Sequence, residues 1–520
     1  MEIHTLEQMR QKLVEYDKVY IYGAGMIGQM AARYITKIGR RTEAFLVSRA
    51  DVAEVGGIQV QIPEALMSAK QNYIIVIGAN ESNRQEMAEN LNRLGISDYL
   101  TFTKAVEYEM RKQSFDWIAE QQKKEYINGM PVDGEKLSVG YLTPGYLDTI
   151  YAEKRLIVNK IRDTEAEYIP VPKEIDYIAG NGDDNTTLET NKMVCEAYYK
   201  PRIYQPKTDV IHTFNQVCII DKPWCASFET LMPRIFSQEE RYKEYFEHCT
   251  EALQKDNCLG LFALCQNAYD IQKRFLLRRC GECIQSVIDK TMVLHPPQKT
   301  VVSVEELERK AEKKERQLTF LFIGGGFFFK GGREIVNVLT CLRREYDFRL
   351  IVISSLLHND YFTHVPREEM VKYRAILQES EWIEYYDRLS NEQVLEMCRQ
   401  ADIGLLPSFG DTYGYSVLEM QAAGLPVITS DIRAFTEIND SECGWIVNLP
   451  LDENKCCVNK DMAELSFLLE RQLTECITSI LEHQELVARK GRKAYERIVK
   501  MHNPTVYAKK LKEVYRRKDY

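Results

Sequence analysis

Two carboxylates and one lysine have a type and spacing that suit the binding of a phosphorylated ligand. Asp411 lies in a short glycine-containing loop, and Glu419 follows eight residues later on a segment with helical spacing. Lys330 closes a second glycine-rich loop, which begins at Gly324. Backbone N–H groups in such loops and a lysine ammonium can hold phosphate, whereas a carboxylate can favour a cationic centre. The pattern predicts a phosphate site with carboxylates beside it.

The elements that must position Asp411 follow the order strand, loop, helix and strand. Ile403 to Leu406 and Val427 to Thr429 are short apolar runs, and Ser416 to Ala423 between them has helical spacing. In parallel α/β sheets, ligands bind beyond the carboxyl ends of the strands, where helix N-termini present unpaired N–H groups. The loop before this helix is therefore expected to lie at a binding edge.

The segment PSFGDTYGYSVLEMQAAGLPVI, residues 407–428, resembles the donor-site signature of family 4 glycosyltransferases. The resemblance implies a GT-B fold and transfer of a sugar from a UDP- or GDP-sugar to a glycan or lipid-linked acceptor. It further implies retention of anomeric configuration, with no metal and no cofactor required. Asp411, where the family usually has glutamate, is implied to face the donor sugar, and Glu419 to hydrogen-bond the ribose.

The strand expected over 318–323 and the glycine loop after it resemble the phosphate-contacting loop of the same family. Lys330 is then implied to bind the diphosphate. Gly325 stands where the family usually has an arginine, and Arg333 or Arg433 could supply the missing charge. The other residues that the resemblance places around the donor are Gly325, Gly326, Arg388, Thr412, Tyr413, Gly414, Tyr415 and Ser416.

Two residues of the preceding unit are candidates for a catalytic role beside Asp411. The family usually has a histidine at a strand end here, but the strand expected over 224–228 runs into Glu229. His212 lies at the expected end of the neighbouring strand, in an Asp-x-x-His pattern that the family often has. It could equally be a hydrogen-bonded structural histidine.

A third glycine-rich turn lies near the N-terminus, with Gly23, Gly25 and Gly28 between an expected strand and helix. Such glycines let the backbone approach a diphosphate at a helix N-terminus. The acid that an NAD site would have after the second strand is missing, which weakens that interpretation. The unit resembles the N-terminal domain of bacterial sugar acyltransferases, which implies either a nucleotide-sugar site or a docking domain.

The expected fold class is α/β: a GT-B-type pair of Rossmann-like domains preceded by an additional Rossmann-like domain. A chain of 520 residues is too long for a single core. The expected organisation is an N-terminal Rossmann-like domain (1–102), a helical linker (103–135), an acceptor-side domain (136–300), a charged linker (301–317), a donor domain (318–480) and basic C-terminal helices returning to the acceptor-side domain (481–520).

Composition narrows the expected location and partners. A net charge of −9 argues against general nucleic-acid binding, and the fourteen cysteines lack the spacing of a disulfide framework. No apolar run is long enough for a transmembrane helix. We therefore expect a cytoplasmic protein, and the resemblance implies a bacterial one of polysaccharide biosynthesis. The basic C-terminal segment could bring it to the inner face of the membrane through peripheral contact.

Two alternative functions share the same nucleotide site. One is a GT-B nucleotide-sugar epimerase or hydrolase, which would need no separate acceptor. The other is a non-catalytic, nucleotide-sugar-binding partner of another glycosyltransferase. The departures at Asp411, Gly325 and Glu229 favour the latter. Acceptor-dependent release of nucleotide distinguishes a transferase from both.

Overall fold

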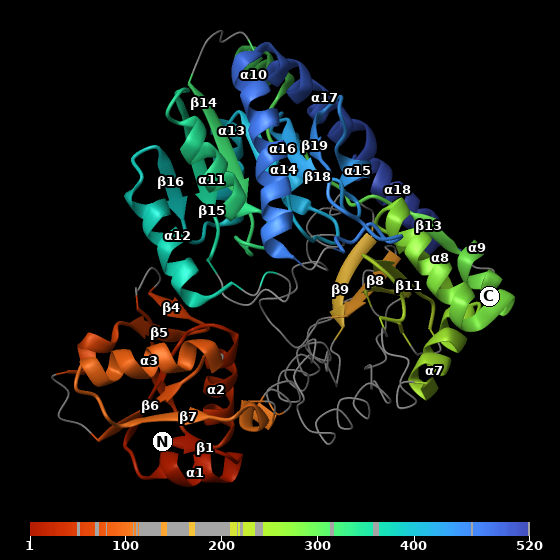
Figure 1. Cartoon of the computed structure of the whole chain (residues 1–520). Coiled ribbons are helices and arrows are strands. Elements are labelled where there is room, and N and C mark those ends of the chain that lie inside the picture. Colours follow the sequence, from red (N-terminus) through yellow and green to blue (C-terminus); the bar gives the residue numbers. More distant parts are fainter. Residues whose placement is uncertain are drawn as a thin grey trace.

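The computed structural model describes three parallel α/β units and the helices that follow them (Figure 1). The described residues are 1–48, 53–67, 72–79, 81–107, 109–110, 113, 137–142, 166–171, 209–215, 217–218, 222–234, 243–311, 317–356, 363, 365–458 and 461–517. Most of the linker helix expected over 103–135 lies outside them.

The N-terminal unit is a seven-stranded sheet with the strand order β1-β7-β6-β2-β3-β5-β4. All of its pairs are parallel except β4 with β5, and its two central strands, β2 and β6, are apolar and largely buried. Two separate hydrophobic clusters, one on each side, cover this sheet. The elements are β1 (Glu2–Ile3), α1 (Leu6–Val14), β2 (Lys18–Tyr22), α2 (Met26–Lys37), β3 (Thr42–Leu46), β4 (Glu54–Val55), β5 (Ile58–Gln61), the 3-10 helix η1 (Pro63–Leu66), β6 (Tyr73–Ile77), α3 (Glu81–Arg93) and β7 (Tyr99–Phe102).

The middle unit is a six-stranded parallel sheet with the order β13-β12-β11-β10-β8-β9. Its central strands β10, β11 and β12 are buried along their whole length, as is typical of a parallel sheet covered on both faces. The elements are β8 (Leu137–Leu142), β9 (Ala166–Val171), β10 (Val210–Phe214), β11 (Trp224–Phe228), α7 (Lys243–Gln254), β12 (Cys258–Ala263), α8 (Gln266–Cys280), the 3-10 helix η4 (Gly281–Ile284), α9 (Gln285–Asp289) and β13 (Thr291–Val293).

The third unit is another six-stranded parallel sheet, in the order β16-β15-β14-β17-β18-β19. The chain builds outward from β14 to β16 and then returns to place β17 on the other side of β14. The strand order therefore reverses between β14 and β17, the point where doubly wound sheets bind ligands. The elements are α10 (Val304–Ala311), β14 (Leu318–Ile323), α11 (Gly332–Leu342), β15 (Phe348–Ile353), α12 (Arg367–Glu379), β16 (Ile383–Tyr386), α13 (Asn391–Gln400), β17 (Ile403–Leu406), α14 (Tyr415–Ala422), β18 (Val427–Ser430), α15 (Phe435–Ile438), β19 (Gly444–Val447) and α16 (Met462–Glu482).

Two C-terminal helices, α17 (Glu485–Met501) and α18 (Pro504–Tyr515), connect the third unit with the middle unit. A Cβ on Gly491 of α17 would lie 2.3 Å from Gly424 O, so this helix packs closely on the third unit. In α18, Val514 packs against Gly260 of β12 in the middle sheet. Between the two helices, His502 Nδ1 donates to Pro296 O (2.8 Å), next to the crossover from the middle to the third unit. The chain thus passes between these units twice at neighbouring points.

A single hydrophobic cluster runs through the middle and third units, whereas the N-terminal unit has its own clusters. The parallel strand pairs and alternating helices confirm the predicted α/β fold class with Rossmann-like sheets.

Candidate functional site

Lys330 and Asp411 meet at the carboxyl ends of β14 and β17, the two strands between which the strand order reverses. Lys330 Nζ lies 2.5 Å from Asp411 Oδ2 and donates to Gly410 O (3.1 Å). Each of the two side chains is only 17% exposed. The two loops that the sequence singled out thus form one half-buried, charge-paired site.

Two glycines let the loops after β14 and β17 come this close. A Cβ on Gly410 would lie 2.3 Å from the Phe329 ring, and one on Gly331 would lie 2.6 Å from Pro407 O. Gly331 also has a φ of +79°, which side chains disfavour, at the N-terminus of α11. Any larger residue at either position would separate Lys330 from Asp411.

The second oxygen of Asp411 is held by the loop that leads into α14. Asp411 Oδ1 accepts hydrogen bonds from Thr412 N (2.7 Å) and Tyr413 N (3.3 Å). Gly414, with a φ of +87°, is the N-cap residue of α14 and makes no side-chain cap. The helix N-terminus is therefore oriented toward the loop that carries Asp411.

Glu229 follows β11 directly and approaches this loop from the middle unit. Asn215 Nδ2 donates to Glu229 Oε2 (3.1 Å), and Glu229 N donates to Asn215 Oδ1 (3.0 Å). Burial raises the pKa of Glu229, and the Asp411 carboxylate raises it further. Hydrogen bonds from Asn215 and Thr412 and the charge of Arg234 oppose that rise. Two of the predicted catalytic candidates, Glu229 and Asp411, therefore lie close enough to interact electrostatically.

Asn215 is a residue of this site that the sequence did not single out. It has a φ of +55°, a conformation that asparagine tolerates better than most residues. In this conformation its amide makes the paired contact with Glu229. The residue follows β10 and was visible as a strand-end asparagine, but its backbone angle cannot be read from sequence.

His212 lies at the centre of β10, not at a strand end as the sequence suggested. It is fully buried. Its Nδ1 lies 2.6 Å from Tyr515 Oη and its Nε2 lies 2.9 Å from Ser227 Oγ. Burial lowers the pKa of His212 to about 3. This environment keeps the imidazole neutral and attaches α18 to the middle sheet.

Glu419 is buried on the inner side of α14, where Asn391 Nδ2 donates to its Oε1 (3.2 Å). Asn391 is the first residue of α13, three residues after the exposed Arg388. The loop after β16 and the end of α14 are therefore neighbours. Arg388 thus lies in the loop that leads into α13, the helix whose first residue contacts Glu419.

The glycine loop after β14 leaves room at Gly325. No atom lies within 4 Å of a Cβ built there, while Ser355 Oγ donates to Gly325 O (3.2 Å). Neighbouring Gly326 forms an isolated bridge with Leu356. Arg333 does not supply the missing charge, because it is paired with Glu334 (2.8 Å) and Glu369 (3.1 Å).

Tyr415 and Ser416 begin the helix behind Asp411, and Tyr413 directly precedes its N-cap residue, Gly414. The Tyr413 hydroxyl is buried and lies 3.0 Å from His295 Nδ1, at the crossover between the units. Burial lowers the pKa of His295 to about 4, helped by the charges of Lys510 and Arg497. Tyr415 stacks obliquely on Tyr413, with ring centroids 5.4 Å apart, and Ser416 is partly exposed.

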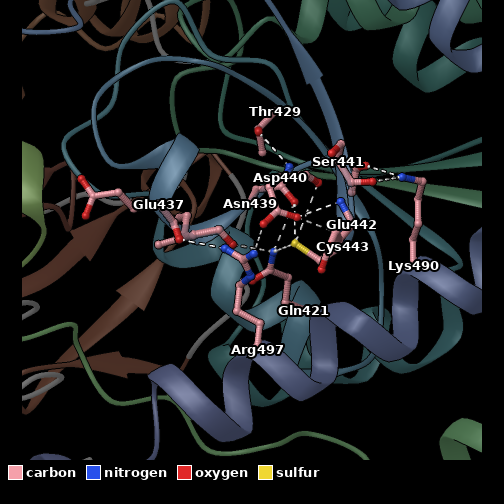
Figure 2. A network of polar contacts seen from close by, with 12 residues as sticks. Gln421, Thr429, Glu437, Asn439, Asp440, Ser441, Glu442, Cys443, Lys490 and Arg497 are labelled. Carbon is pink, nitrogen blue, oxygen red and sulfur yellow. Dashed lines mark hydrogen bonds and ion pairs between the residues drawn. The ribbon is translucent and has the colours of Figure 1, made fainter.

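Glu437, which the sequence did not single out, joins the third unit to the middle unit. Its carboxylate accepts hydrogen bonds from Gln266 N (2.7 Å) and Asn267 N (2.8 Å), the first residues of α8. Arg497 of α17 donates to Glu437 O (2.9 Å) and pairs with Asp440, as Figure 2 shows. A side chain from one unit thereby caps a helix of the other.

The N-terminal glycine turn is closely packed on itself. A Cβ on Gly28 would lie 1.8 Å from Gly23 O, and one on Gly23 would lie 2.7 Å from Gly78 O. Gly25, in contrast, has open space at its Cβ position and is the N-cap residue of α2. The close packing of the turn is thus a sufficient reason for two of the three glycines.

Residues 303–454 match the family model described as "Glycosyl transferases group 1". The match includes Lys330, Asp411 and Glu419 but not Glu229. The third unit is therefore similar to glycosyltransferase group 1 domains. In the described part of the chain, no group of three or more His, Cys, Asp or Glu residues could hold a metal ion. No described helix is long and apolar enough to cross a membrane.

Two curated relatives and one solved structure show what the chain resembles. It is 26% identical over 175 residues to "Uncharacterized 41.2 kDa protein in cps region" of Klebsiella pneumoniae, covering 32% of this chain and 44% of that protein. It is 26% identical over 146 residues to "Lipopolysaccharide glucosyltransferase WaaG" of Escherichia coli K12, covering 27% of this chain and 36% of that protein. The chain thus spans less than half the length of these relatives. Anabaena HepE in complex with UDP-glucose superposes with a TM-score of 0.46 at 11% identity, over 72% of this chain and 98% of that one.

Proposed function

We propose that this protein transfers a sugar from a nucleotide-sugar donor, a UDP- or GDP-sugar, to a glycan or lipid-linked acceptor. The observation that carries the proposal is the Lys330–Asp411 pair at the strand-order reversal, with Glu229 of the middle unit close to it. All three residues lie where the middle and third units face each other. A glycosyl transfer needs such a position, because donor and acceptor must meet there. The group 1 family match supports the donor half of this assignment.

In this proposal, the diphosphate lies against Lys330 and the amides at the N-terminus of α14. The ammonium group and the helix N-terminus oppose the negative charge that develops as the nucleotide leaves. Neither group needs a metal ion to do so, and the reaction retains anomeric configuration. Lys330 pairs with Asp411 in this structure. On donor binding, Lys330 therefore either leaves Asp411 for the diphosphate or contacts both.

Asp411 then acts on the sugar half of the donor, and Glu419 on the nucleotide half. The Asp411 carboxylate favours a cationic, oxocarbenium-like sugar, and Glu419 accepts from ribose hydroxyls in place of Asn391. Glu229 lies on the acceptor side. Because its pKa is raised, its protonated form persists to higher pH and can donate a hydrogen bond to a sugar oxygen.

A second function, nucleotide-sugar binding without transfer, is favoured by one specific observation. The only cation of the glycine loop, Lys330, is already neutralised by Asp411, and Gly325 adds no charge beside it. Such a protein would bind a donor and serve as partner of another glycosyltransferase. The relative named as a lipopolysaccharide glucosyltransferase leads us to propose bacterial surface polysaccharide synthesis as the setting for either function.

A thermal-shift screen against UDP-, GDP- and TDP-sugars tests the donor site. We expect one nucleotide class to raise the melting temperature, and Glu419→Ala and Lys330→Ala to reduce that rise. Loss of a charge-assisted hydrogen bond costs about 1.5–3 kcal/mol of binding, or roughly tenfold to a hundredfold in affinity. Unchanged nucleotide affinity in both folded variants would refute the site. Release of nucleotide that depends on acceptor would exclude the binding-only function.

A further inference from the structure

A cavity of about 290 Å³ lies between α8 of the middle unit and two loops of the third unit. Four arginines line it: Arg274, Arg278 and Arg279 from α8, and Arg433 from the loop after β18. None of the described residues that line it is acidic. A small cavity lined by four guanidinium groups and by no described acidic residue has a positive potential that favours an anionic ligand.

The arginines are only partly neutralised by the protein. Arg278 forms a bidentate pair with Glu453 (2.8 and 3.0 Å) at the cavity's outer side, where both side chains are more than half exposed. Arg274 donates to Asn454 Oδ1 (2.8 Å) and Glu453 O (3.2 Å), which carry no compensating charge of their own. The Glu453 carboxylate thus pairs with Arg278, whereas these two hydrogen bonds of Arg274 go to neutral oxygen atoms.

The inner face of α8 holds these groups in fixed orientations. Arg279 lies over the Phe246 ring, 4.1 Å from its centroid, which immobilises its guanidinium plane. Arg274 Nε is buried and has no hydrogen-bond partner among the described residues. Buried N–H donors of arginine are rarely left without an acceptor, so this one favours an additional acceptor beside α8.

The third unit's side of the cavity is held in an unusual backbone conformation. Arg433 has a φ of +43°, and its backbone N–H donates to the carbonyl of Lys455 (3.0 Å), which has a φ of +56°. Such conformations are strained for residues other than glycine, and they concentrate at ligand sites. The strained pair directs Arg433 toward α8, across the boundary between the units.

The cavity also adjoins the proposed reaction centre. Thr230 and Leu231, which line it, directly follow Glu229. Glu437, which caps the N-terminus of α8, holds the helix against the third unit beside the cavity. A ligand anchored by the arginines would therefore extend from the outer end of α8 toward Glu229.

We propose that this arginine cavity binds a phosphate group of the acceptor, an inference that rests on the proposed transferase function. Guanidinium groups bind phosphate through paired N–H donors, and the four around this cavity match the several oxygens of one phosphate. A phosphate is favoured over a carboxylate because it presents more acceptor oxygens and more charge to a four-arginine site. The group would anchor the acceptor with its hydroxyl side toward Glu229.

Isothermal titration of inorganic phosphate into the full-length protein tests the site without any turnover. We expect Arg433→Gln and Arg274→Gln each to weaken phosphate binding by at least about tenfold. Arg433→Lys should recover only part of it, because lysine keeps the charge but not the paired donors. The matched control is Arg492→Gln. Like Arg278 of the cavity, Arg492 is an exposed partner of a glutamate (Glu308, 2.8 Å), but it lies on α17 away from the cavity. It should leave the affinity unchanged.

A second control separates this site from the donor site. Lys330→Ala should weaken nucleotide binding roughly tenfold to a hundredfold yet leave phosphate binding at the arginine cavity intact. If phosphate does not bind, or binds equally well to Arg433→Gln and Arg274→Gln, the acceptor-phosphate site is refuted even where nucleotide binding stands. If phosphate binds as expected but no nucleotide sugar does, the proposed function fails and the cavity remains.

Two further probes identify the source of the phosphate. A hexose phosphate that binds tighter than inorganic phosphate, and loses affinity in Arg433→Gln, would assign the site to a phosphorylated sugar acceptor. Vesicles of phosphatidylglycerol in phosphatidylcholine that bind the wild-type protein but not Arg433→Gln would assign it to a lipid phosphate. Either result supports the site.

Discussion

The pH dependence of stability tests whether His212 is a buried structural histidine, because a catalytic histidine and a structural one respond differently to pH. The imidazole is fully buried between Tyr515 Oη and Ser227 Oγ, and its pKa is lowered to about 3. The folded protein therefore holds it neutral at every pH above about 4. In the unfolded chain it takes up a proton near its ordinary pKa of about 6.5.

This difference makes His212 a source of acid sensitivity. The folded pKa lies below the unfolded one, so the stabilisation is complete above about pH 6.5 and is lost progressively as the pH falls toward 3. At about pH 5 the pH lies about 1.5 units below the unfolded pKa, so the unfolded chain is protonated at this site while the folded protein is not. At about 1.4 kcal/mol per unit, the free energy of unfolding should fall by about 2 kcal/mol from His212 alone.

Urea unfolding of the wild type and His212→Gln at both pH values measures this contribution. Glutamine keeps a donor and an acceptor for Tyr515 and Ser227 but does not titrate. We expect the variant to be less stable at pH 7.5 yet to lose about 2 kcal/mol less than the wild type on acidification. His295, with a pKa of about 4, contributes equally to both proteins. Equal losses in the two proteins, or an NMR titration of the His212 ring near pH 6.5, would refute this account.

Three other changes test separate parts of the structure. Because a side chain at Gly325 meets open space, Gly325→Arg should bind the donor nucleotide about tenfold more tightly in calorimetry; unchanged affinity would place the diphosphate elsewhere. Glu437→Ala removes the cap on α8 and should lower the free energy of unfolding by about 1–2 kcal/mol, whereas Glu437→Gln should lose less; equal losses would exclude a capping role. Deleting residues 1–103 should leave nucleotide affinity within a few-fold, since that unit has its own hydrophobic clusters; a folded truncation that binds no nucleotide would make the N-terminal unit part of the donor site.

Much of the architecture could be predicted because parallel strands in α/β units are short apolar runs between clear turn signals. The predicted strands at Lys18–Tyr22, Trp224–Phe228 and Leu318–Ile323 have the observed bounds. The strands β12 and β19 were missed. In β12, cysteine, glycine and alanine interrupt the apolar pattern, and β19 begins with a glycine soon after the polar residues 439–442.

The proximity of Lys330 and Asp411 could be expected from their motif positions, but their direct ion pair could not. It depends on two glycines that let neighbouring loops touch, and sequence spacing alone does not give that distance. The sequence left the role of His212 open between catalysis and structure for a similar reason. Its partner Tyr515 lies 303 residues away, so only the folded return of α18 shows that the ring is enclosed.

The contacts between the units were the least predictable part. Glu437 and the arginines of α8 show no motif, because a carboxylate at a helix end and an arginine-rich helix face are common on solvated surfaces. The cap that Glu437 provides and the cavity that the arginines line are visible only once α8 lies against the third unit.

The central claim is that Asp411 acts on the donor sugar while the rest of the site holds the nucleotide. The direct test is steady-state transfer from the donor found in the screen, with nucleotide affinity measured in parallel for wild type and Asp411→Asn. The account predicts a loss of turnover on the order of a hundredfold, with nucleotide affinity unchanged or tighter because Lys330 is released. Equal turnover in both proteins would contradict the role of Asp411, and a wild type that binds the donor but transfers to no acceptor would contradict catalysis altogether.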